Sequence, residues 1–259
     1  MDRITSARNP MVQRMRALKS AKARRESNLF LVEGEVMIRE AIGCGLKMHE
    51  LLADDSAADF ALEMENGGAR AALVGRDLLE SVCETRTPQG VCAAFEQPHQ
   101  IGFEVLPDRV IALDGVQDPG NVGTIWRTAD AAGFQAILLG HGSADPLSPK
   151  VQRAAMGSGF RLSFRCEKDL AVSLKSLRDL GFRVIVSDLH GNDFYSRPPL
   201  GEKFVLVIGN EARGISDAVR EQADMRLKLP MRGGAESLNA AVAAGIMMYE
   251  LMREVITTR

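Results

Sequence analysis

The sequence has no long apolar run, few cysteines and few histidines, and each absence excludes a class of protein. No run of eighteen apolar residues is present, so we expect no membrane-spanning helix. The first residues, MDRITSARNP, contain no apolar core of a secretory signal. The four cysteines form no CxxC pair and the four histidines do not cluster, which argues against a disulfide framework or a zinc site. We therefore expect a cytoplasmic protein that needs no metal.

What is present is typical of a globular chain. Of its 259 residues, 46% are apolar and 25% are charged, which argues against extensive disorder. At roughly 150 residues per domain, this length predicts two domains or one large α/β unit.

Charge is distributed unevenly along the chain. Residues 1–27 contain eight basic groups against Asp2 and Glu26, a net charge of +6, so that the remainder must carry −8 to reach the total of −2. The eight are Arg3, Arg8, Arg14, Arg16, Lys19, Lys22, Arg24 and Arg25. A basic arm on an acidic body favours contact with a polyanion such as RNA, although a solvated helix that contacts nothing is an equal alternative. Apolar residues at helical spacing (Met11, Met15, Leu18) predict that the arm is an amphipathic helix.

Beyond the arm, apolar runs alternate with helical stretches in two series. The first predicts strands at 29–32, 50–53, 71–74 and 91–95, with helices over 35–44 and 57–65. A polar stretch containing Pro98, over residues 97–102, predicts a linker. The second series predicts strands at 110–113, 136–139, 182–187 and 204–208, the last apolar on consecutive residues, as in a parallel sheet buried on both faces. We therefore expect an arm (1–27), a small α/β domain (28–98) and a parallel-sheet α/β domain (105–259).

The last predicted helix, Ser237–Arg253, has almost no polar face. A helix that is apolar all round must be covered on most sides. We favour a partner subunit as the cover over the chain's own sheet, because symmetric dimers are common.

Three loops follow or adjoin predicted strands, where open parallel sheets bind their ligands. In the first loop, residues 113–123, Asn121 stands where a helix begins, and capping is its simplest role. Arg127 lies six residues on, about 9 Å along the helix axis, and suits a phosphate, with a surface salt bridge as the alternative.

The second loop, residues 208–214, contains a carboxylate in an unusual place, and the third loop, residues 229–239, contains an amide in an unusual place. Gly209 and Gly214 permit close backbone approach around Glu211, which could brace Arg213 or a nearby backbone. In the third loop, Ser237 could cap the following helix, whereas Asn239 is a lone amide in an apolar helix and should have a defined partner.

Taken in order, the stretches DPGNVGTIWRTADAAG, LVIGNEARGIS and LPMRGGAESLNAAVAAGI resemble the signature motifs of the SpoU (TrmH) family of RNA ribose methyltransferases. The resemblance implies an α/β catalytic domain of the SPOUT type with a trefoil knot. Residues 30–35, FLVEGE, resemble the small ribosomal-protein-like RNA-binding domain that is often fused to it. The resemblance to the methyltransferase family also implies a homodimer that uses S-adenosylmethionine to methylate a ribose 2′-hydroxyl.

The family's functional residues can be carried over to matching positions. The resemblance implies an active site of Asn121, Arg127, Glu211, Ser237 and Asn239. It implies cofactor contacts from Leu139, Ile208, Gly209, Leu229, Met231 and Leu238. Two positions depart from the family pattern: Ala155 lacks a hydroxyl, and Trp126 is bulkier than the usual aliphatic residue and could line the RNA side of the pocket.

The roles implied for these residues leave alternatives. Arginine stays protonated up to about pH 12, so we favour Arg127 as a phosphate clamp over the family's proposed base. Asn121 and Ser237 would position the hydroxyl or the arginine, Asn239 would hold the loops, and Glu211 would orient a cation or accept a proton. The fused domain favours ribosomal RNA over transfer RNA as the substrate. A non-catalytic RNA-binding or ribosome-assembly factor and an enzyme acting on a small nucleotide are the alternative functions.

Overall fold

The computed structural model describes residues 1–257, with side chains through residue 253, and divides into two compact units. Unit 1 contains residues 1–99 together with 147–160, and unit 2 contains residues 100–146 together with the chain from residue 161 onward. The boundary at residue 99 falls inside the linker expected over 97–102, but the return of residues 147–160 to unit 1 was not anticipated. None of the helices described is both long and apolar enough to cross a membrane.

Unit 1 is built on a mixed five-stranded sheet. Its strands, in spatial order, are β1 (Asp2–Ile4), β4 (Ala71–Val74), β3 (Met48–Ala53), β5 (Val91–Glu96) and β2 (Leu29–Glu33). β1 and β3 run parallel to β4, whereas β5 is antiparallel to both β3 and β2. The four strands expected from the apolar runs are present, and the short edge strand β1 was missed.

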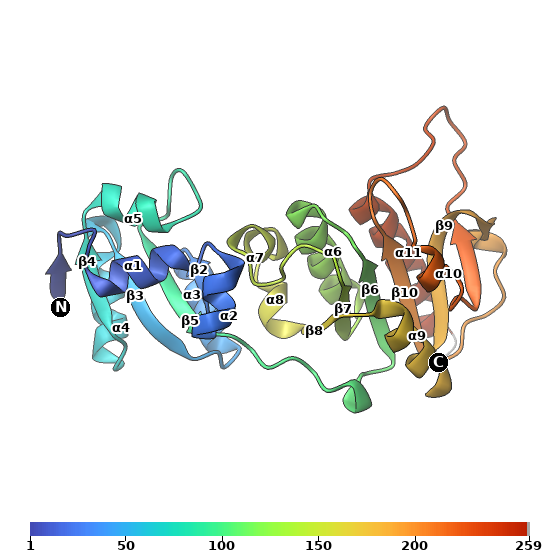
Figure 1. Cartoon of the computed structure of the whole chain (residues 1–259), viewed down its shortest axis with the longest axis horizontal. Helices are drawn as coiled ribbons and strands as arrows, with labels where there is room; N and C mark the ends of the chain where they lie inside the picture. The colour runs from blue at the N-terminus through green and yellow to red at the C-terminus, as the bar shows by residue number, and fades with distance from the viewer. Residues whose placement is uncertain (258–259) are drawn as a thin grey trace. The chain divides into compact units, whose positions relative to one another are not determined.

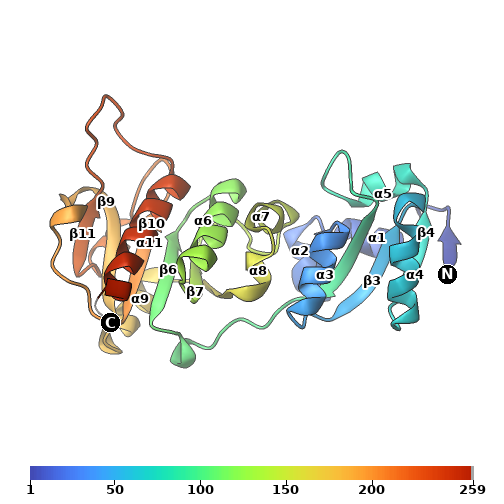
Figure 2. The same ribbon diagram turned by 180° about the vertical axis from the view of Figure 1, so that it is seen from behind.

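Helices cover both faces of this sheet (Figures 1 and 2). Those of the first 99 residues are α1 (Pro10–Ala17), α2 (Ala21–Ser27), α3 (Glu35–Gly43), α4 (Ala58–Asn66) and α5 (Arg76–Val82), with a 3-10 turn η1 (Asp55–Ala57). α7 (Pro149–Ala155) contacts β2, and the short helix α8 (Ser158–Arg161) ends at the first residue of the chain's return to unit 2. α1 and α5 pack on one face of the sheet, where Met11, Val12 and Met15 join Leu29 and Leu31 in one buried cluster. The alternate strand residues, such as Phe30, are buried on the opposite side.

The basic segment at residues 1–27 is therefore part of unit 1 and not a separate arm. Its helix α1 supplies core residues, and several of its cations have intramolecular partners. Arg3, Arg14 and Lys22 form ion pairs with Asp55, Glu50 and Glu26. Arg24 is buried and donates to the carbonyl oxygens of Leu18 and Lys19 at 2.7 and 2.9 Å. The net charge of +6 consequently overstates what this segment offers a polyanion.

Unit 2 contains a six-stranded sheet in which every pairing is parallel, confirming the expected α/β class. The spatial order is β11 (Met225–Lys228), β9 (Arg183–Asp193), β10 (Phe204–Gly209), β6 (Arg109–Asp114), β7 (Ala136–Gly140) and β8 (Ser163–Glu167). β10 and β6, the central neighbours, are buried along almost their whole length, as their uninterrupted apolar sequences predict. β8 and β11 were not predicted, because SFRCE and MRLK are short and partly polar.

Helices lie on both faces of this sheet as well. α9 (Leu170–Asp179) and α10 (Asp217–Arg220) pack against one face, and their buried residues join alternate residues of β6, β9 and β10. α6 (Pro119–Ala132) and α11 (Ala240–Thr257) lie side by side on the other (Figure 2). Two 3-10 turns, η2 (Phe103–Val105) and η3 (Phe194–Ser196), lie in connecting segments.

The final helix differs from expectation in its start and in its burial. α11 begins at Ala240, three residues later than predicted. The side chains of Met247, Met248 and Leu251 are fully buried against the rest of unit 2. Along its length, however, Val242 and Tyr249 are 51% and 55% exposed. The chain's own fold therefore covers only part of this apolar helix.

Candidate functional site

The first two predicted loops meet at one edge of the unit 2 sheet. β6 and β10 are neighbours and run parallel, so the loops that follow them leave the same edge. Several hydrogen bonds join the loops directly. Among them, Asn210 Nδ2 donates to the Gly115 carbonyl oxygen at 2.8 Å, and the Ser216 backbone N–H donates to Asp114 at 2.7 Å. A Cβ at Gly209 would overlap the backbone of Gly214, which explains why glycine is required at that crossing.

Three of the five predicted active-site residues form a continuous hydrogen-bonded chain, drawn from all three loops. Asn239 Nδ2 donates to Asn121 Oδ1 at 2.9 Å, and Asn121 Nδ2 donates to Glu211 Oε1 at 3.0 Å. The Glu211 carboxylate also accepts the backbone N–H groups of Gln117 and Asp118, both at 3.1 Å. Residues up to 118 positions apart in the sequence are thereby fixed to one another.

The direction of donation along this chain is set by its two ends. An ionised carboxylate only accepts, so Asn121 must turn its Nδ2 toward Glu211 and its Oδ1 toward Asn239. At the other end, Asn239 Oδ1 accepts the backbone N–H groups of Ala241 and Val242, at 2.9 and 3.2 Å. Each amide is therefore held in one orientation by a charge on one side and a helix N-terminus on the other.

The helix caps differ from those that the local sequence suggests. Asp118, and not Asn121, caps α6: its carboxylate accepts the Asn121 backbone N–H at 2.8 Å, which leaves the Asn121 amide for the network. Asn239, and not Ser237, caps α11. The expectation that Asn239 has a defined partner is confirmed, because it bonds both to the helix and to Asn121.

Glu211 is maintained as an anion. Burial raises the pKa of its carboxyl group, but hydrogen bonds from Asn121 and from backbone N–H groups outweigh that effect and bring the pKa below the ordinary value of 4.5. A base is most effective when its pKa lies near the working pH, so this carboxylate is a weak proton acceptor. Its contacts are with an amide and the backbone, so it does not brace Arg213.

Arg127 projects from the exposed side of α6. Its side chain has no hydrogen bond or ion pair within the part of the chain that the structure describes, so the alternative of a surface salt bridge has no support among those residues. A guanidinium without a carboxylate partner retains its full donor set for an anion. Trp126, which precedes Arg127 in α6, is fully buried against Phe164, with ring centroids 5.5 Å apart. The expectation that Trp126 lines the RNA side of the pocket is therefore wrong.

A cleft of about 520 Å³ opens beside the second and third loops. Six of the predicted residues line it: Glu211, Leu229, Met231, Ser237, Leu238 and Asn239. The other predicted wall residues are placed differently, because Leu139 and Ile208 are 3% exposed within β7 and β10 and Gly209 supports the loop crossing. The cleft combines apolar side chains with backbone groups and a carboxylate, a lining suited to a small ligand with both polar and apolar parts.

Sequence reasoning missed one wall of this cleft, Ser187–His190, which continues β9 past its last pairing with β10. Asp188 is buried there and accepts hydrogen bonds from Arg220 Nε at 3.1 Å and Arg226 Nε at 3.0 Å. Burial raises the pKa of the Asp188 carboxyl, but the His190 backbone N–H and Arg226 outweigh this and leave that pKa below its ordinary range. The signal was available, because these residues follow the strand predicted over 182–187. No group of three or more potential metal ligands was found among the described residues.

Comparison with known proteins gives concordant matches for both units. The sequence model of the SpoU rRNA Methylase family matches residues 108–249, and that of an MRM3-like substrate binding domain matches residues 9–93. The first of these spans includes residues 147–160, which pack with unit 1 in the structure.

Individual relatives match over nearly the whole chain. The 23S rRNA (guanosine(2553)-2'-O)-methyltransferase RlmP of Bacillus subtilis is 37% identical over 97% of this chain and 99% of its own. The crystal structure of an AdoMet-bound rRNA methyltransferase from Sinorhizobium meliloti has a TM-score of 0.88 at 32% identity, covering 98% of each chain. That of the SpoU methyltransferase AviRb from Streptomyces viridochromogenes, with the cofactor AdoMet, has a TM-score of 0.85 at 30% identity and covers 97% of this chain and 100% of its own. These matches confirm the family resemblance of the three motifs.

Proposed function

Because the chain belongs to the SpoU rRNA Methylase family, we propose that it uses S-adenosylmethionine to methylate a ribose 2′-hydroxyl in ribosomal RNA. The observation that carries this proposal is the Asn239–Asn121–Glu211 network, together with Arg127, which has no hydrogen-bond or ion-pair partner among the described residues. The network holds three loops in one arrangement, and Arg127, on the same helix as Asn121, supplies an exposed cation without a partner among the described residues. Such a constellation suits alignment of a phosphate-bearing substrate.

The cleft fits the cofactor that this family uses. Leu229, Met231 and Leu238 provide apolar wall, and the loop around Glu211 provides backbone groups for a polar ligand. S-adenosylmethionine, when bound, supplies a methyl group on a sulfonium centre that leaves as a neutral thioether. The ribose oxygen forms a bond to this methyl group as the sulfur–methyl bond breaks, and the hydroxyl proton passes to water. The protein must therefore align the acceptor hydroxyl and stabilise its developing negative charge.

We assign alignment and charge stabilisation to Arg127. Its guanidinium is exposed and unpaired within the described residues, as a phosphate clamp requires. The depressed pKa of Glu211 favours a positioning role for that carboxylate, through Asn121, over proton abstraction. Ser237 lines the cleft and is not used as a helix cap, so its hydroxyl is available to position a ligand.

We further propose that the active form is a homodimer containing the family's trefoil knot, and that it acts in the cytoplasm. The support for a dimer is the row of apolar side chains that α11 leaves exposed: Val242, Ile246 and Tyr249 are spaced at helical intervals and are 51%, 37% and 55% exposed. Ile246→Glu should convert the dimer to a monomer in light scattering. A wild-type chain that is fully active as a monomer would refute the dimer.

The function is tested by mapping ribose methylation in total RNA from cells with and without the gene, followed by methylation of the implicated RNA with purified protein. One ribosomal ribose should lose its methyl group without the gene and regain it in vitro. Binding of S-adenosylmethionine with no methyl transfer to any RNA would instead support the non-catalytic RNA-binding factor. A methylated position in transfer RNA would retain the chemistry and replace the substrate.

A further inference from the structure

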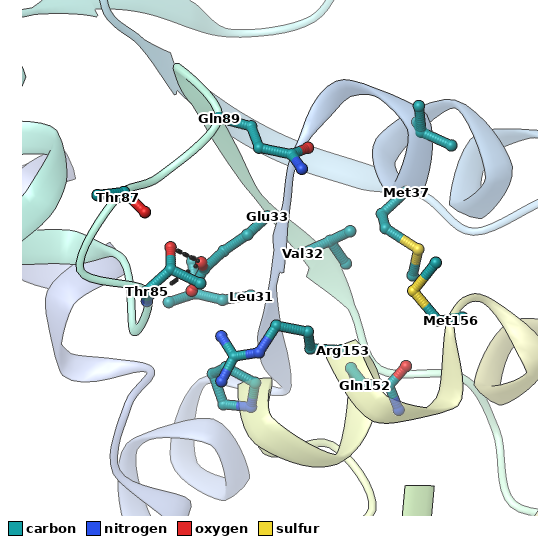
Figure 3. A pocket seen from close by; sticks show the side chains of 12 residues that line it. Leu31, Val32, Glu33, Met37, Thr85, Thr87, Gln89, Gln152, Arg153 and Met156 are labelled. Atoms are coloured by element: carbon teal, nitrogen blue, oxygen red, sulfur yellow. Dashed lines mark hydrogen bonds between the residues drawn. The ribbon is translucent and has the colours of Figure 1, made fainter. Parts of the chain in front are cut away.

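Unit 1 contains a cavity of about 310 Å³ that the proposed methyl-transfer site does not use. Its floor includes Leu31 and Val32 of β2, and all of its lining residues belong to unit 1. Figure 3 shows Met37 and Met156 together at one end and Thr85 and Thr87 toward the other. At this volume the cavity lies at the lower end of the range for small-ligand pockets, so it admits a single small group.

Half of the residues that line the cavity are apolar, and two of these are unusually exposed. Val36, at the start of α3, is 72% exposed, and Met156, just after α7, is 51% exposed. The backbone of Met156 has a positive φ of 48°, a conformation uncommon for residues other than glycine or asparagine. Thioethers are polarisable and adaptable, and they pack favourably against aromatic rings. These side chains therefore suit a flat aromatic ligand.

One wall of the cavity is polar and already ordered. Glu33 accepts the Glu84 backbone N–H at 2.7 Å and the Thr85 hydroxyl at 2.7 Å, which anchors the loop after α5 to β2. The carboxylate also accepts the Thr85 backbone N–H at 3.4 Å, so about one of its four acceptor positions remains for a ligand N–H donor. Gln89 adds an amide that can both donate and accept.

The cavity also has a cation at its edge. Arg153 of α7 lines it and is exposed, and its side chain has no ion pair or hydrogen bond within the described residues. An apolar slot with hydrogen-bonding groups on one wall and a guanidinium at the edge matches a nucleotide: base in the slot, base edge on the polar groups, phosphate on the arginine.

We infer that this cavity binds one unpaired base of the substrate RNA, whose edge donates one N–H group to the Glu33 carboxylate. The inference rests on the proposed function, because it presumes an RNA substrate. It assigns to unit 1 the recognition of an unstacked base at a site separate from the methyl-transfer cleft. It is consistent with the match of residues 9–93 to a substrate-binding domain.

The first experiment titrates the full-length protein, labelled with ¹³C at its methionine methyl groups, with guanosine 5′-monophosphate. Signals of Met37 and Met156, assigned with Met37→Leu and Met156→Leu, should shift, while that of Met248, buried in unit 2, should not. Ribose 5-phosphate should shift neither, because it lacks the base. Unchanged Met37 and Met156 signals with all four ribonucleoside monophosphates would overturn the inference.

The second experiment blocks the cavity. Met37→Trp should raise the KM for the RNA substrate about tenfold, within the range found for stacking of one base, and leave kcat and S-adenosylmethionine affinity near wild type. Leu62→Trp is the matched control, because Leu62 is 46% exposed on α4 of the same unit and does not line the cavity. An equal KM for the two variants contradicts the base site and leaves the proposed function intact. Failure of the wild-type protein to methylate RNA would contradict the proposed function, and the nucleotide titration would still decide the cavity.

Discussion

Arginines in the two units are used in opposite ways. In unit 1, Arg14 forms an ion pair with Glu50, whose side chain is fully buried, and Nε donates to that carboxylate at 2.8 Å. In unit 2, Arg127 is exposed and, among the residues described, has no partner at all. The first arginine neutralises a buried charge, whereas the second keeps its charge available to a ligand.

Glu50 of unit 1 and Glu211 of unit 2 also differ in their burial and in their partners. Glu50 lies in the interior of unit 1 and has arginine partners, Arg14 and, at 3.9 Å, Arg70. Glu211 lies in an exposed loop of unit 2 and is held by an amide and backbone N–H groups. The comparison teaches that the number of charges in a segment does not by itself indicate a binding function. Charged side chains without an internal partner are the better indication of one.

Replacing Arg127 should produce the largest effect on activity. Arg127→Ala should lower methyl transfer by about 10²–10³-fold, because a preorganised cation that stabilises developing charge is lost. Arg127→Lys should recover little, since an ammonium cannot bind a phosphate in the bidentate mode. Single-turnover methylation and calorimetry measure the two expected quantities, a lower rate and an unchanged cofactor affinity. Loss of cofactor binding in Arg127→Ala would place this arginine on the cofactor side of the site.

Replacing Arg14 should affect stability instead of chemistry. Arg14→Met should lower the free energy of unfolding by about 3 kcal/mol, because it leaves Glu50 buried without its nearest counter-charge. Arg8→Met is the control, since Arg8 is exposed on the same segment and should tolerate the change. Urea denaturation followed by circular dichroism measures both variants. The contrast between Arg14 and Arg127 would fail if Arg14→Met were as stable as wild type but inactive.

The network around Glu211 should respond to charge and to pH. Glu211→Gln should weaken S-adenosylmethionine binding about tenfold, at the lower end of the effect of a charged hydrogen bond because the side chain is exposed. Since the folded-state pKa of Glu211 lies below 4.5, its stabilising effect is complete above that pH and is lost as the pH falls through the folded value.

Calorimetric measurement of S-adenosylmethionine affinity at neutral pH and at about pH 4 or below tests this expected direction of the pH dependence. The wild-type affinity should fall toward that of Glu211→Gln as the pH is lowered, while the variant should change less. A wild-type affinity that rises on acidification would show that the protonated carboxyl is the active form.

The smallest effect is expected from the cations of unit 1 that are exposed and have no ion pair among the residues described. The double variant Arg8→Gln/Arg25→Gln should weaken RNA binding several-fold and lower the slope of log affinity against log salt by roughly one to two. Arg39→Gln is the matched control, because Arg39 is exposed in the same unit but paired with Glu35 and Glu63. Deleting residues 1–27 would not test the point, since α1 belongs to the core. An equal salt slope in all three proteins would indicate that these cations contact only solvent.

Strands with uninterrupted apolar sequences could be predicted almost residue by residue. β4 matches its prediction, and β10 and β6 differ from theirs only at the ends. Short or polar strands such as β1 and β11 could not be predicted, because their stability comes from pairing with β4 and β9 and not from their own residues. The cleft wall at Ser187–His190 could have been inferred from the strand predicted over 182–187, but only the structure shows that β9 continues past its last pairing with β10 and lines the cleft.

The sequence by itself determined the family and the parallel sheet of unit 2, and its resemblance to that family predicted five active-site residues. Motif order and consecutive apolar residues are local properties that survive without coordinates. Only the tertiary structure decided which of those residues touch, that Asp118 and Asn239 take the capping roles, that Trp126 points into the core, and that most of the basic segment is internally paired. The physical reason is that a hydrogen bond or ion pair is a relation between two groups, and residues 118 positions apart carry no local mark of their partnership.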